Sequence, residues 1–309
     1  MSLPDRNKLL TQPPQNISSF VNISDIVCPL CGSNSNRIFK THDYWLRDCQ
    51  ACGHRFTEIE WTDNHLREVY SELYFKGGGA GYSDYLSEAE LLRASGYRYG
   101  KLAAQYAGAT GRVLDVGAAA GFILQGFEQA GWRGNGIEPN YEMYRFAEDE
   151  LGVNVENCSV ENFESREQFE LISLIQVIAH LPKPREILQK LSRLTKKDGH
   201  LLIETWRRDS LTARLFGRHW HEYSPPSVLH WFTGKRLQSL VEEAGFRVIA
   251  TGRPVKRVNA AHAKSLLTYK LRQISGGKFL SQGLFFIPDN ILIPYPAEDL
   301  FWLLCQKIG

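Results

Sequence analysis

The chain has 309 residues, of which 43% are hydrophobic and 23% charged, and a formal net charge of +2. These values are normal for a globular protein. The length suits one large domain with a small appendage, or two ordinary domains, and the hydrophobic core of such a chain can be large enough to need no disulfides. The small net charge argues against a strongly basic nucleic-acid-binding surface, and no apolar run has the length of a membrane span.

Residues 1–24 are polar and contain prolines, and we expect them to form a loose arm. This arm lacks the apolar centre of a signal peptide, so the default expectation is a cytoplasmic protein. In that compartment six cysteines favour metal binding or simple burial over disulfides.

Two C-x2-C pairs lie in the segment 25–60 and predict a zinc ribbon. The pairs are Cys28 with Cys31 and Cys49 with Cys52, and a glycine follows each second cysteine. Glycine permits the tight turn that points backbone N–H groups at the sulfur atoms. Four thiolates form a closed tetrahedral Zn²⁺ site without a position for water, so the metal is expected to be structural. The alternatives are two redox motifs or a site that has lost its metal.

Residues 61–110 are expected to form a helical linker, with a helix over 87–107. The glycine-rich run 77–81 precedes Tyr82 and Tyr85. Because this run makes the two tyrosines movable, one hypothesis is that they close over a cofactor as a lid. The alternative is a flexible linker with surface tyrosines.

From residue 111 to residue 309, short apolar runs alternate with helical segments. The expected strands are 112–116, 134–138, 153–157, 171–176, 200–204, 246–251 and 299–307, and the expected helices are 122–130, 141–151, 185–194 and 233–244. This alternation is typical of a parallel sheet that helices cover on both faces. The region 255–296 is an expected insertion, either a substrate cap or a dimer surface.

The segment VLDVGAAAG, residues 113–121, joins an expected strand to an expected helix. Gly117 can take a positive φ angle, and the small side chain of Ala119 lets a ligand approach the backbone. The spacing up to Gly121 fits the dinucleotide-binding pattern poorly. Asp115 would repel a pyrophosphate, but its carboxylate suits a ligand with an ammonium or sulfonium group. The helix N-terminus that follows offers free N–H groups to the same ligand.

Glu138 closes the next expected strand, in NGIEPN. A carboxylate at this edge of a parallel sheet can accept hydrogen bonds from both ribose hydroxyls of a nucleoside. The alternative is a surface glutamate before a turn.

The motifs LDVGAAAG, GIEPN, LISLIQVIAHLPKP and LTKKDGHLLIET follow one another in this order. They resemble the successive motifs of class I S-adenosylmethionine (SAM)-dependent methyltransferases, over roughly residues 85–252. The resemblance implies SAM as cofactor and an α/β, Rossmann-like fold. Its seven-stranded sheet would have an antiparallel last strand, which 299–307 would supply. Similar proteins with a cysteine ribbon often act on sugars, sugar nucleotides or secondary metabolites.

The same resemblance implies roles for single residues. Asp115 and the loop 117–121 would hold the methionine part of SAM. Glu138, which Pro139 follows, would bind the ribose. Ser159 would lie beside the adenine, where the family more often has an acidic residue, and Gln176 would lie beside the cofactor at the end of the fourth strand.

Three further side chains are candidates for catalysis. His180 follows the expected strand 171–176, where similar methyltransferases often carry a histidine, and it is either a general base or a brace for its loop. His221 and Tyr223 lie in the stretch RHWHEYSPPSVLHWFT, after the fifth strand, where doubly wound sheets place substrate loops. We expect one of these two to face the substrate; the alternative is a folded aromatic loop with buried partners.

The main hypothesis is an enzyme that methylates a small molecule on oxygen, nitrogen or carbon. The second is an RNA methyltransferase whose ribbon docks nucleic acid, against which the near-neutral charge of the N-terminal part argues. The third is a non-catalytic SAM-binding or interaction protein. The sequence leaves a homodimer open.

Overall fold

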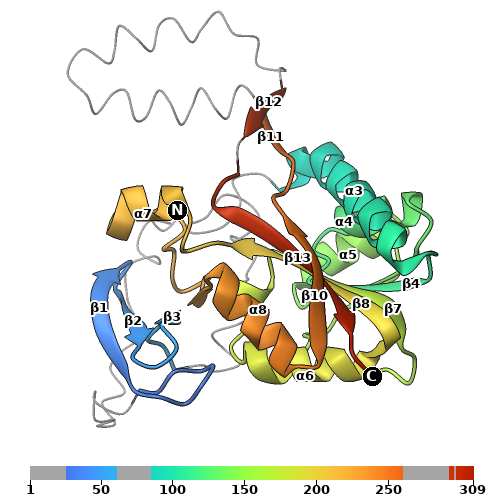
Figure 1. Cartoon of the computed structure of the whole chain (residues 1–309). Helices are drawn as coiled ribbons and strands as arrows, with labels where there is room; N and C mark the ends of the chain where they lie inside the picture. The colour runs from blue at the N-terminus through green and yellow to red at the C-terminus, as the bar shows by residue number, and fades with distance from the viewer. Residues whose placement is uncertain (1–25, 61–84, 260–291, 296) are drawn as a thin grey trace, which may run out of the picture.

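A seven-stranded sheet with the strand order β10-β13-β8-β7-β4-β5-β6 lies at the centre of the computed structural model (Figure 1). The structure describes residues 26–60, 85–259, 292–295 and 297–309. The strands are β4 (Arg112–Val116), β5 (Arg133–Ile137), β6 (Val155–Glu156), β7 (Phe169–Ile175), β8 (Thr195–Trp206), β10 (Phe246–Gly252) and β13 (Leu300–Lys307). β13 runs antiparallel to both β10 and β8, whereas the β4–β5, β4–β7, β5–β6 and β7–β8 pairs are parallel. The predicted fold, with its antiparallel last strand, is confirmed.

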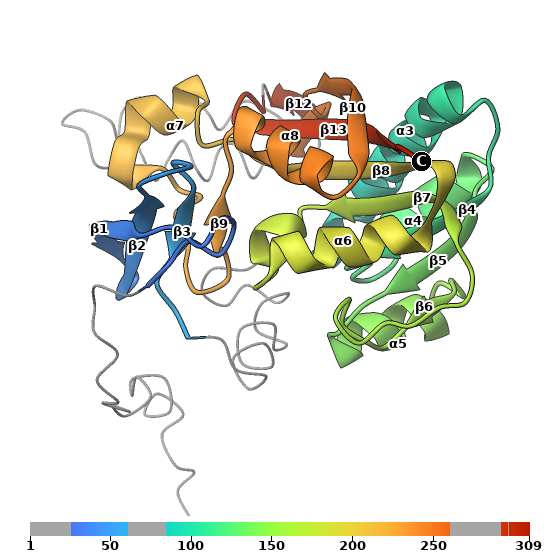
Figure 2. The ribbon, with the colours of Figure 1, turned by 60° about the horizontal axis from the view of Figure 1, so that its bottom comes forward.

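Five longer helices cover the two faces of this sheet (Figures 1 and 2). They are α3 (Ala89–Ala107), α4 (Phe122–Gln129), α5 (Tyr141–Asp149), α6 (Pro184–Leu194) and α8 (Gly234–Glu243). On one face Ala103, Leu124 and Ala147 from α3, α4 and α5 join one buried cluster. On the other face Leu188 of α6 and Leu240 of α8 join a second cluster. The apolar runs therefore fold as strands with both faces of the sheet covered, as the alternation of these runs with helical segments predicted.

The N-terminal ribbon builds a second sheet with the order β1-β2-β3-β9. β1 (Ser35–Thr41), β2 (Tyr44–Cys49) and β3 (Arg55–Thr57) come from the ribbon, whereas β9 (His230–Trp231) comes from the chain between β8 and α8. Figure 2 shows β9 beside β3. Cys28, Leu30 and Phe56 of the ribbon belong to the same buried cluster as α6 and α8. The ribbon thus shares a sheet and a core with the rest of the chain, and the predicted boundary at residue 60 stays a prediction.

The remaining elements are short. They are η3 (Leu86–Glu88), η4 (Ile178–His180), α7 (Leu211–Phe216), η5 (Gly217–His219), β11 (Lys256–Asn259) and β12 (Leu292–Tyr295). No described helix is long and apolar enough to cross a membrane. The arm 1–24, Tyr82 and most of the expected insertion 255–296 lie outside the described residues.

Candidate functional site

The loop between β4 and α4 forms a tight turn at the carboxyl edge of the sheet. Gly117 and Gly121 have φ angles of 71° and 83°, in the left-handed region that glycine adopts without steric cost. The N–H groups of Gly117 and Ala118 both donate to the carbonyl of Ile137, at 2.9 and 3.0 Å, which ties the loop to the end of β5. Because α4 begins directly afterwards at Phe122, its free N–H groups lie at the loop.

Ala119 also has a left-handed backbone, with a φ angle of 47°, although it carries a side chain. This conformation costs a non-glycine residue roughly 1–2 kcal/mol and is worse for a β-branched one. We therefore expect Ala119→Val to lower the free energy of unfolding by about 2–3 kcal/mol. Ala119→Gly should stay within about 1 kcal/mol of the wild type. Urea unfolding measures both, and equal effects of the two substitutions would contradict a strained backbone here.

Asp115 lies in β4, two residues before Gly117, and its side chain is buried. Its Oδ1 accepts a 2.7 Å hydrogen bond from the Ser173 hydroxyl on the neighbouring strand β7. Burial raises the pKa of Asp115 to about 7, although the Ser173 hydrogen bond opposes the shift. A carboxylate has more lone pairs than this one donor uses, so Asp115 can still accept hydrogen bonds from a cationic ligand.

Glu138 follows β5, and its buried carboxylate contacts the loop. Oε2 accepts from the N–H of Ala119 at 2.9 Å, and Oε1 accepts from the N–H of Asn140 at 2.7 Å. Burial raises the pKa of Glu138 to about 7; the two N–H groups lower this pKa, and the charge of Asp115 raises it. Since each oxygen has a second lone pair, the carboxylate can also accept ribose hydroxyls.

The raised pKa values of Asp115 and Glu138 predict a pH dependence of SAM binding. In the unfolded chain these carboxyl groups lose their protons near pH 4, but in the folded protein they do so near pH 7. The folded protein without ligand should therefore lose stability as the pH rises through this window. SAM offers cationic and hydroxyl donors, which favour the ionised carboxylates, so its affinity should increase between about pH 6 and pH 7. Calorimetry across this range checks the direction, and a falling affinity would contradict it.

Tyr85 lies against the glycine loop. Its ring stacks on Phe122 with the centroids 6.0 Å apart and the planes inclined by 24°, and only 5% of Tyr85 is exposed. The same buried cluster contains Ala119, Ala120 and Met143. Tyr85 thus packs against the residues of the glycine loop, whereas the other tyrosine of the lid hypothesis, Tyr82, lies outside the described residues. Contact of Tyr85 with a cofactor stays a prediction.

Pro139 and Ser159 lie two and three residues beyond the ends of β5 and β6. The Asn157 side chain donates to the carbonyls of Glu138 and Pro139, at 2.9 and 3.2 Å, and so links these two ends. The carbonyl of the half-buried Ser159 accepts from the N–H groups of Asn162 and Phe163, which makes Ser159 the start of a turn. A role of either residue at the cofactor stays a prediction.

Gln176 directly follows β7 with a left-handed φ angle of 61°, and Glu204 of β8 holds it in place. The Gln176 N–H donates to the Glu204 carbonyl at 2.9 Å, and its side-chain amide donates to Glu204 Oε1 at 2.7 Å. Glu204 is buried, and its other oxygen accepts from the hydroxyl of Tyr99 on α3. Sequence reasoning missed Glu204 and Tyr99, although an acid that closes the apolar strand HLLIE was a visible signal.

His180 lies at the end of η4, and its Nδ1 is 2.7 Å from the carbonyl of Ser227. A carbonyl accepts only, so Nδ1 carries the proton and donates. Burial lowers the pKa of His180, although this hydrogen bond opposes the shift. The contact is the one that a bracing histidine makes, and a role as general base stays a prediction.

His221 and Tyr223 lie in different environments. The His221 side chain is exposed, and its Nε2 is 2.7 Å from a carboxylate oxygen of Glu222. Tyr223 is 4% exposed, and its hydroxyl accepts a 2.7 Å hydrogen bond from Arg55 of the ribbon. Burial raises the pKa of the Tyr223 hydroxyl. For Tyr223 these surroundings match the folded aromatic loop of the alternative hypothesis, while His221 keeps access to solvent.

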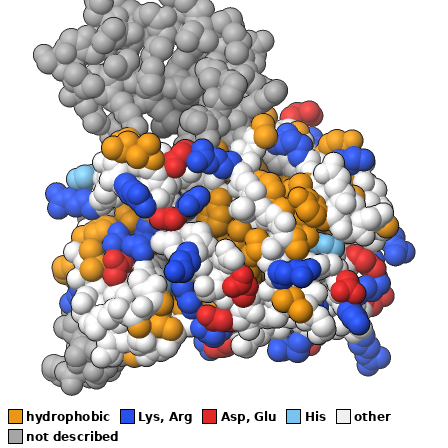
Figure 3. All heavy atoms as spheres, viewed as in Figure 1, with side chains coloured by type: hydrophobic (Ala, Val, Ile, Leu, Met, Phe, Trp, Pro, Cys, Tyr) orange, Lys and Arg blue, Asp and Glu red, His pale blue; other side chains and the backbone are white. Residues whose placement is uncertain are grey.

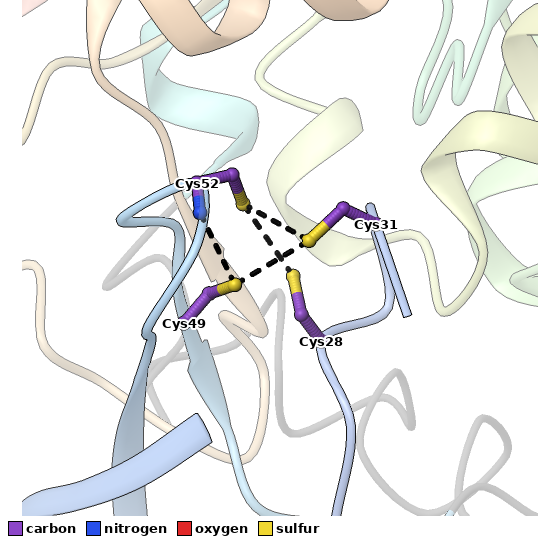
Figure 4. A group of neighbouring side chains, drawn as sticks. All are labelled: Cys28, Cys31, Cys49 and Cys52. Carbon is purple, nitrogen blue, oxygen red and sulfur yellow. Dashed lines mark hydrogen bonds between the residues drawn. The ribbon is translucent and has the colours of Figure 1, made fainter. Parts of the chain in front are cut away.

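The four ribbon cysteines point toward one another (Figure 4), with their sulfur atoms within 4.8 Å. Sulfur atoms are 3.7 Å apart for Cys28 and Cys52, 3.4 Å for Cys31 and Cys49, and 3.5 Å for Cys31 and Cys52. A zinc ion with bonds of about 2.3 Å places tetrahedral sulfurs about 3.8 Å apart, so the four residues fit this metal. Each of these contacts joins sulfurs of different C-x2-C pairs, which favours a shared metal over two redox motifs.

Backbone N–H groups of the knuckles also lie at the sulfurs, as the following glycines indicated. The N–H of Leu30 donates to Cys28 Sγ, and the N–H of Cys52 donates to Cys49 Sγ, each at 3.4 Å. Such donors stabilise the thiolate form that binds a metal ion.

The strand order is that of a doubly wound α/β sheet, and the glycine loop and the two buried carboxylates lie at the carboxyl edge of its parallel strands. A family profile described as "Methyltransferase domain" matches residues 88–251, and the chain belongs to this family. It is 27% identical over 153 residues to a ubiquinone biosynthesis O-methyltransferase of Rhodopseudomonas palustris (strain TIE-1), covering 43% of this chain and 60% of that protein. A protein of the same name from Actinobacillus pleuropneumoniae serotype 5b (strain L20) is 29% identical over 108 residues, covering 31% and 46%. The chain thus spans less than two thirds of the length of these curated relatives.

Solved structures agree on the fold. The magnesium protoporphyrin IX methyltransferase of Synechocystis PCC 6803 with bound S-adenosylhomocysteine (SAH) superimposes with a TM-score of 0.52 at 11% identity, covering 80% of this chain and 100% of that one. The 1,6-didemethyltoxoflavin-N1-methyltransferase of Burkholderia thailandensis, with bound 1,6-didemethyltoxoflavin and SAH, gives a TM-score of 0.51 at 15% identity, covering 89% of this chain and 100% of that one.

Proposed function

We propose that the protein transfers the methyl group of SAM to a small-molecule acceptor. The observation that carries this proposal is the meeting of Asp115, the left-handed loop at Gly117 and Gly121, and the Glu138 carboxylate at one edge of the sheet. Membership of the methyltransferase domain family supports it, as do the relatives named O-methyltransferases.

SAM supplies an electrophilic methyl group on its sulfonium sulfur. In our proposal the chain positions this group for in-line attack, since positioning is the main contribution a protein makes to such a transfer. The loop and Asp115 hold the methionine part, and Glu138 binds the ribose. Gln176, fixed by Glu204, borders the cofactor on the side of β7. Tyr85 excludes water above the loop.

For the acceptor we propose a sugar, a sugar nucleotide or a secondary metabolite, and the charges of the ribbon favour this class over RNA. Every Lys and Arg in residues 26–60 has an acidic partner: Arg37 and Arg47 pair with Glu58, Lys40 with Asp43, and Arg55 with Asp48. On the face shown in Figure 3, basic and acidic side chains are interspersed among hydrophobic and other side chains. RNA binding needs a group of basic side chains that neutralise phosphates, and paired cations do this poorly.

A methyl-transfer screen tests the proposal. The protein, as a full chain with its metal, is incubated with methyl-labelled SAM and separate pools of sugar nucleotides, phenolic metabolites and total RNA. We expect label to enter a small-molecule pool, and Glu138→Ala should abolish this incorporation. Label that enters RNA alone would replace the proposal with the RNA hypothesis, and no incorporation from any pool would favour the non-catalytic one.

We further propose that Zn²⁺ is the metal of the four cysteines and that its role is structural, because all four positions are thiolates and none is left for a substrate. The ribbon 25–60 and the methyltransferase part 111–309 are then two units of one folded body, joined by the segment 61–110.

A further inference from the structure

The 217–232 loop, between α7 and α8, is held by the ribbon through its backbone. The ribbon strand β3 pairs antiparallel with β9 of this loop. Just beyond that pair, the N–H of Thr57 donates to the carbonyl of Leu229 at 2.9 Å, and the Thr57 hydroxyl donates to the carbonyl of Val228 at 3.0 Å. β9 has only two residues, and strands this short are not stable without pairing.

Side chains of the ribbon hold the same loop. Nε2 of His230 is 2.9 Å from the carbonyl of Leu181, so this nitrogen donates, and Nδ1 of His230 accepts from Nε2 of His54 at 3.0 Å. Both rings are buried. The Arg55 guanidinium donates to the hydroxyl of Tyr223 at 2.7 Å. Loss of the His54–His230 or the Arg55–Tyr223 contact would leave a buried polar group without this partner, which costs more than the hydrogen bond itself.

The opposite side of the loop rests on the segment that follows β7. The Leu229 N–H donates to the carbonyl of Ala179 at 2.9 Å, and His180 donates to the carbonyl of Ser227 at 2.7 Å. Ala179 and His180 lie three and four residues after Gln176, the residue we place beside the cofactor. The loop therefore lies between the ribbon and the segment that follows β7.

The second cysteine knuckle, Cys49–Cys52, precedes β3. It lies at the opposite end of this strand from Thr57, which contacts Leu229. Gly53 and His54 directly follow Cys52, and the knuckle closes by hydrogen bonds between Cys49 and these two residues at 3.1 and 2.9 Å. Arg208, which precedes α7, also donates to the Gly53 carbonyl. A metal ion that fixes the knuckle thus fixes the start of β3, and with it the contacts of His54.

A buried aromatic cluster completes the connection. It joins ribbon strand β2, helix α7, the 217–232 loop and the segment after β7 through Leu46, Ala179, Ala213, Trp220, Tyr223, Val228 and Trp231. Side chains of the loop lose apolar contacts if the ribbon moves away, and burial of such rings provides much of the stability of a loop.

We infer that the zinc ribbon is an internal clamp for the 217–232 loop: metal binding orders this loop against Ala179 and His180 and so shapes the acceptor side of the site. The ribbon in this respect belongs to the same folded unit as the methyltransferase part. The edge of its third strand, β3, is paired with β9 and is therefore closed to strand pairing with a partner molecule. The assignment of the loop to the acceptor side rests on the proposed function, whereas the clamp itself rests on the contacts above.

Hydrogen exchange with and without metal tests the clamp. In the full chain with metal, amides of peptide 220–232 should exchange slowly, and removal of the metal by a chelator should speed their exchange by at least about tenfold. Peptide 133–137, in β5, should change by less than about twofold. Unchanged exchange of 220–232 in protein shown to be free of metal would overturn the inference, as would an equal rise in both peptides.

A milder variant keeps the test valid if the metal-free protein unfolds. Thr57→Val removes the hydroxyl bond to Val228 and keeps the side-chain shape, and we expect about fivefold faster exchange in 220–232. Thr195→Val is the matched control, because Thr195 is also buried and its hydroxyl donates to the carbonyl of Leu191 at 2.7 Å, away from the loop. Faster exchange of 220–232 in the control, or none in Thr57→Val, would contradict the clamp.

Calorimetry with SAH separates this inference from the proposed function. We expect SAH affinity to change by less than about twofold in Thr57→Val, because the variant alters the acceptor side and leaves the glycine loop intact. A large loss of SAH affinity in Thr57→Val, but not in Thr195→Val, would contradict the idea that the loop shapes the acceptor side and not the cofactor side. If the wild type itself fails to bind SAH, the proposed function fails, while the exchange experiment still decides whether the clamp exists.

Discussion

Glu138→Ala is expected to weaken the binding of SAM and SAH by at least about a hundredfold, since hydrogen bonds to a charged group contribute about 1.5–3 kcal/mol each. The substitution removes the proposed partner of both ribose hydroxyls. It also leaves the N–H groups of Ala119 and Asn140 without their buried acceptor, so the loop itself loses its support. Isothermal titration calorimetry measures the affinities directly.

Two controls make the Glu138 result specific. Glu142→Ala removes an exposed carboxylate from the first turn of α5, only four residues away, and should leave SAM affinity within about twofold. A circular dichroism spectrum that matches the wild type shows that the Glu138 variant is folded. Normal SAM binding by a folded Glu138→Ala protein would refute the ribose assignment.

Cys49→Ser is expected to reduce bound zinc from one ion per chain to almost none and to lower the melting temperature strongly. The free energy of zinc binding to small four-ligand modules is about 10–16 kcal/mol, and most of it appears as folding stability. Cys28 and Cys49 belong to the buried cluster that also contains side chains of α6 and α8, so the loss extends beyond the ribbon. Metal analysis by mass spectrometry and thermal unfolding measure the two effects.

Cys158→Ser is the matched control for the zinc prediction. Cys158 is half-buried and lies outside the group of four cysteines whose sulfurs converge, so its loss should leave the zinc content unchanged. A Cys49→Ser protein that keeps one zinc ion per chain would contradict the four-thiolate site. Wild-type protein without zinc, but with disulfides in both C-x2-C pairs, would favour the redox alternative.

Local patterns were sufficient to predict most of the central sheet. Strand 112–116 matches β4 at both ends, and helix 185–194 differs from α6 by one residue. Strand β8 begins before the expected residue 200 because a bulge, with a left-handed Asp198, lets pairing with β7 continue to Thr195, and it ends after residue 204 because it pairs with β13 up to Trp206. A bulge leaves no periodic signal in a sequence.

Long-range contacts are the part that the sequence could not provide. The pairing of β3 with β9 joins residues more than 170 positions apart, as the His54–His230 contact shows, and each partner strand has three residues or fewer. Such short strands show no alternation from which pairing can be predicted. The burial of Tyr223 followed from this same contact, because its hydroxyl reaches Arg55 only when the ribbon lies on the loop.

The site divides in the same way. Asp115, Gly117, Gly121 and Glu138 were recognisable because their positions are fixed by neighbouring parallel strands, whose carboxyl ends meet at one edge. Glu204 was not, since its role depends on Tyr99 of a helix more than a hundred residues earlier. The cysteine spacing predicted the ligands, but nothing in it indicated that the ribbon would hold the loop beside the candidate site.

Calorimetric titration with SAM and with SAH tests the central claim most directly. The titrated protein is the wild-type full chain with its metal. We predict one binding site per chain for each ligand, with affinity that rises as the pH increases from about 6 to about 7. Absence of heat from both ligands at concentrations up to about millimolar, where even an affinity of −4 kcal/mol is detectable, would contradict the assignment of this chain as a SAM-dependent methyltransferase.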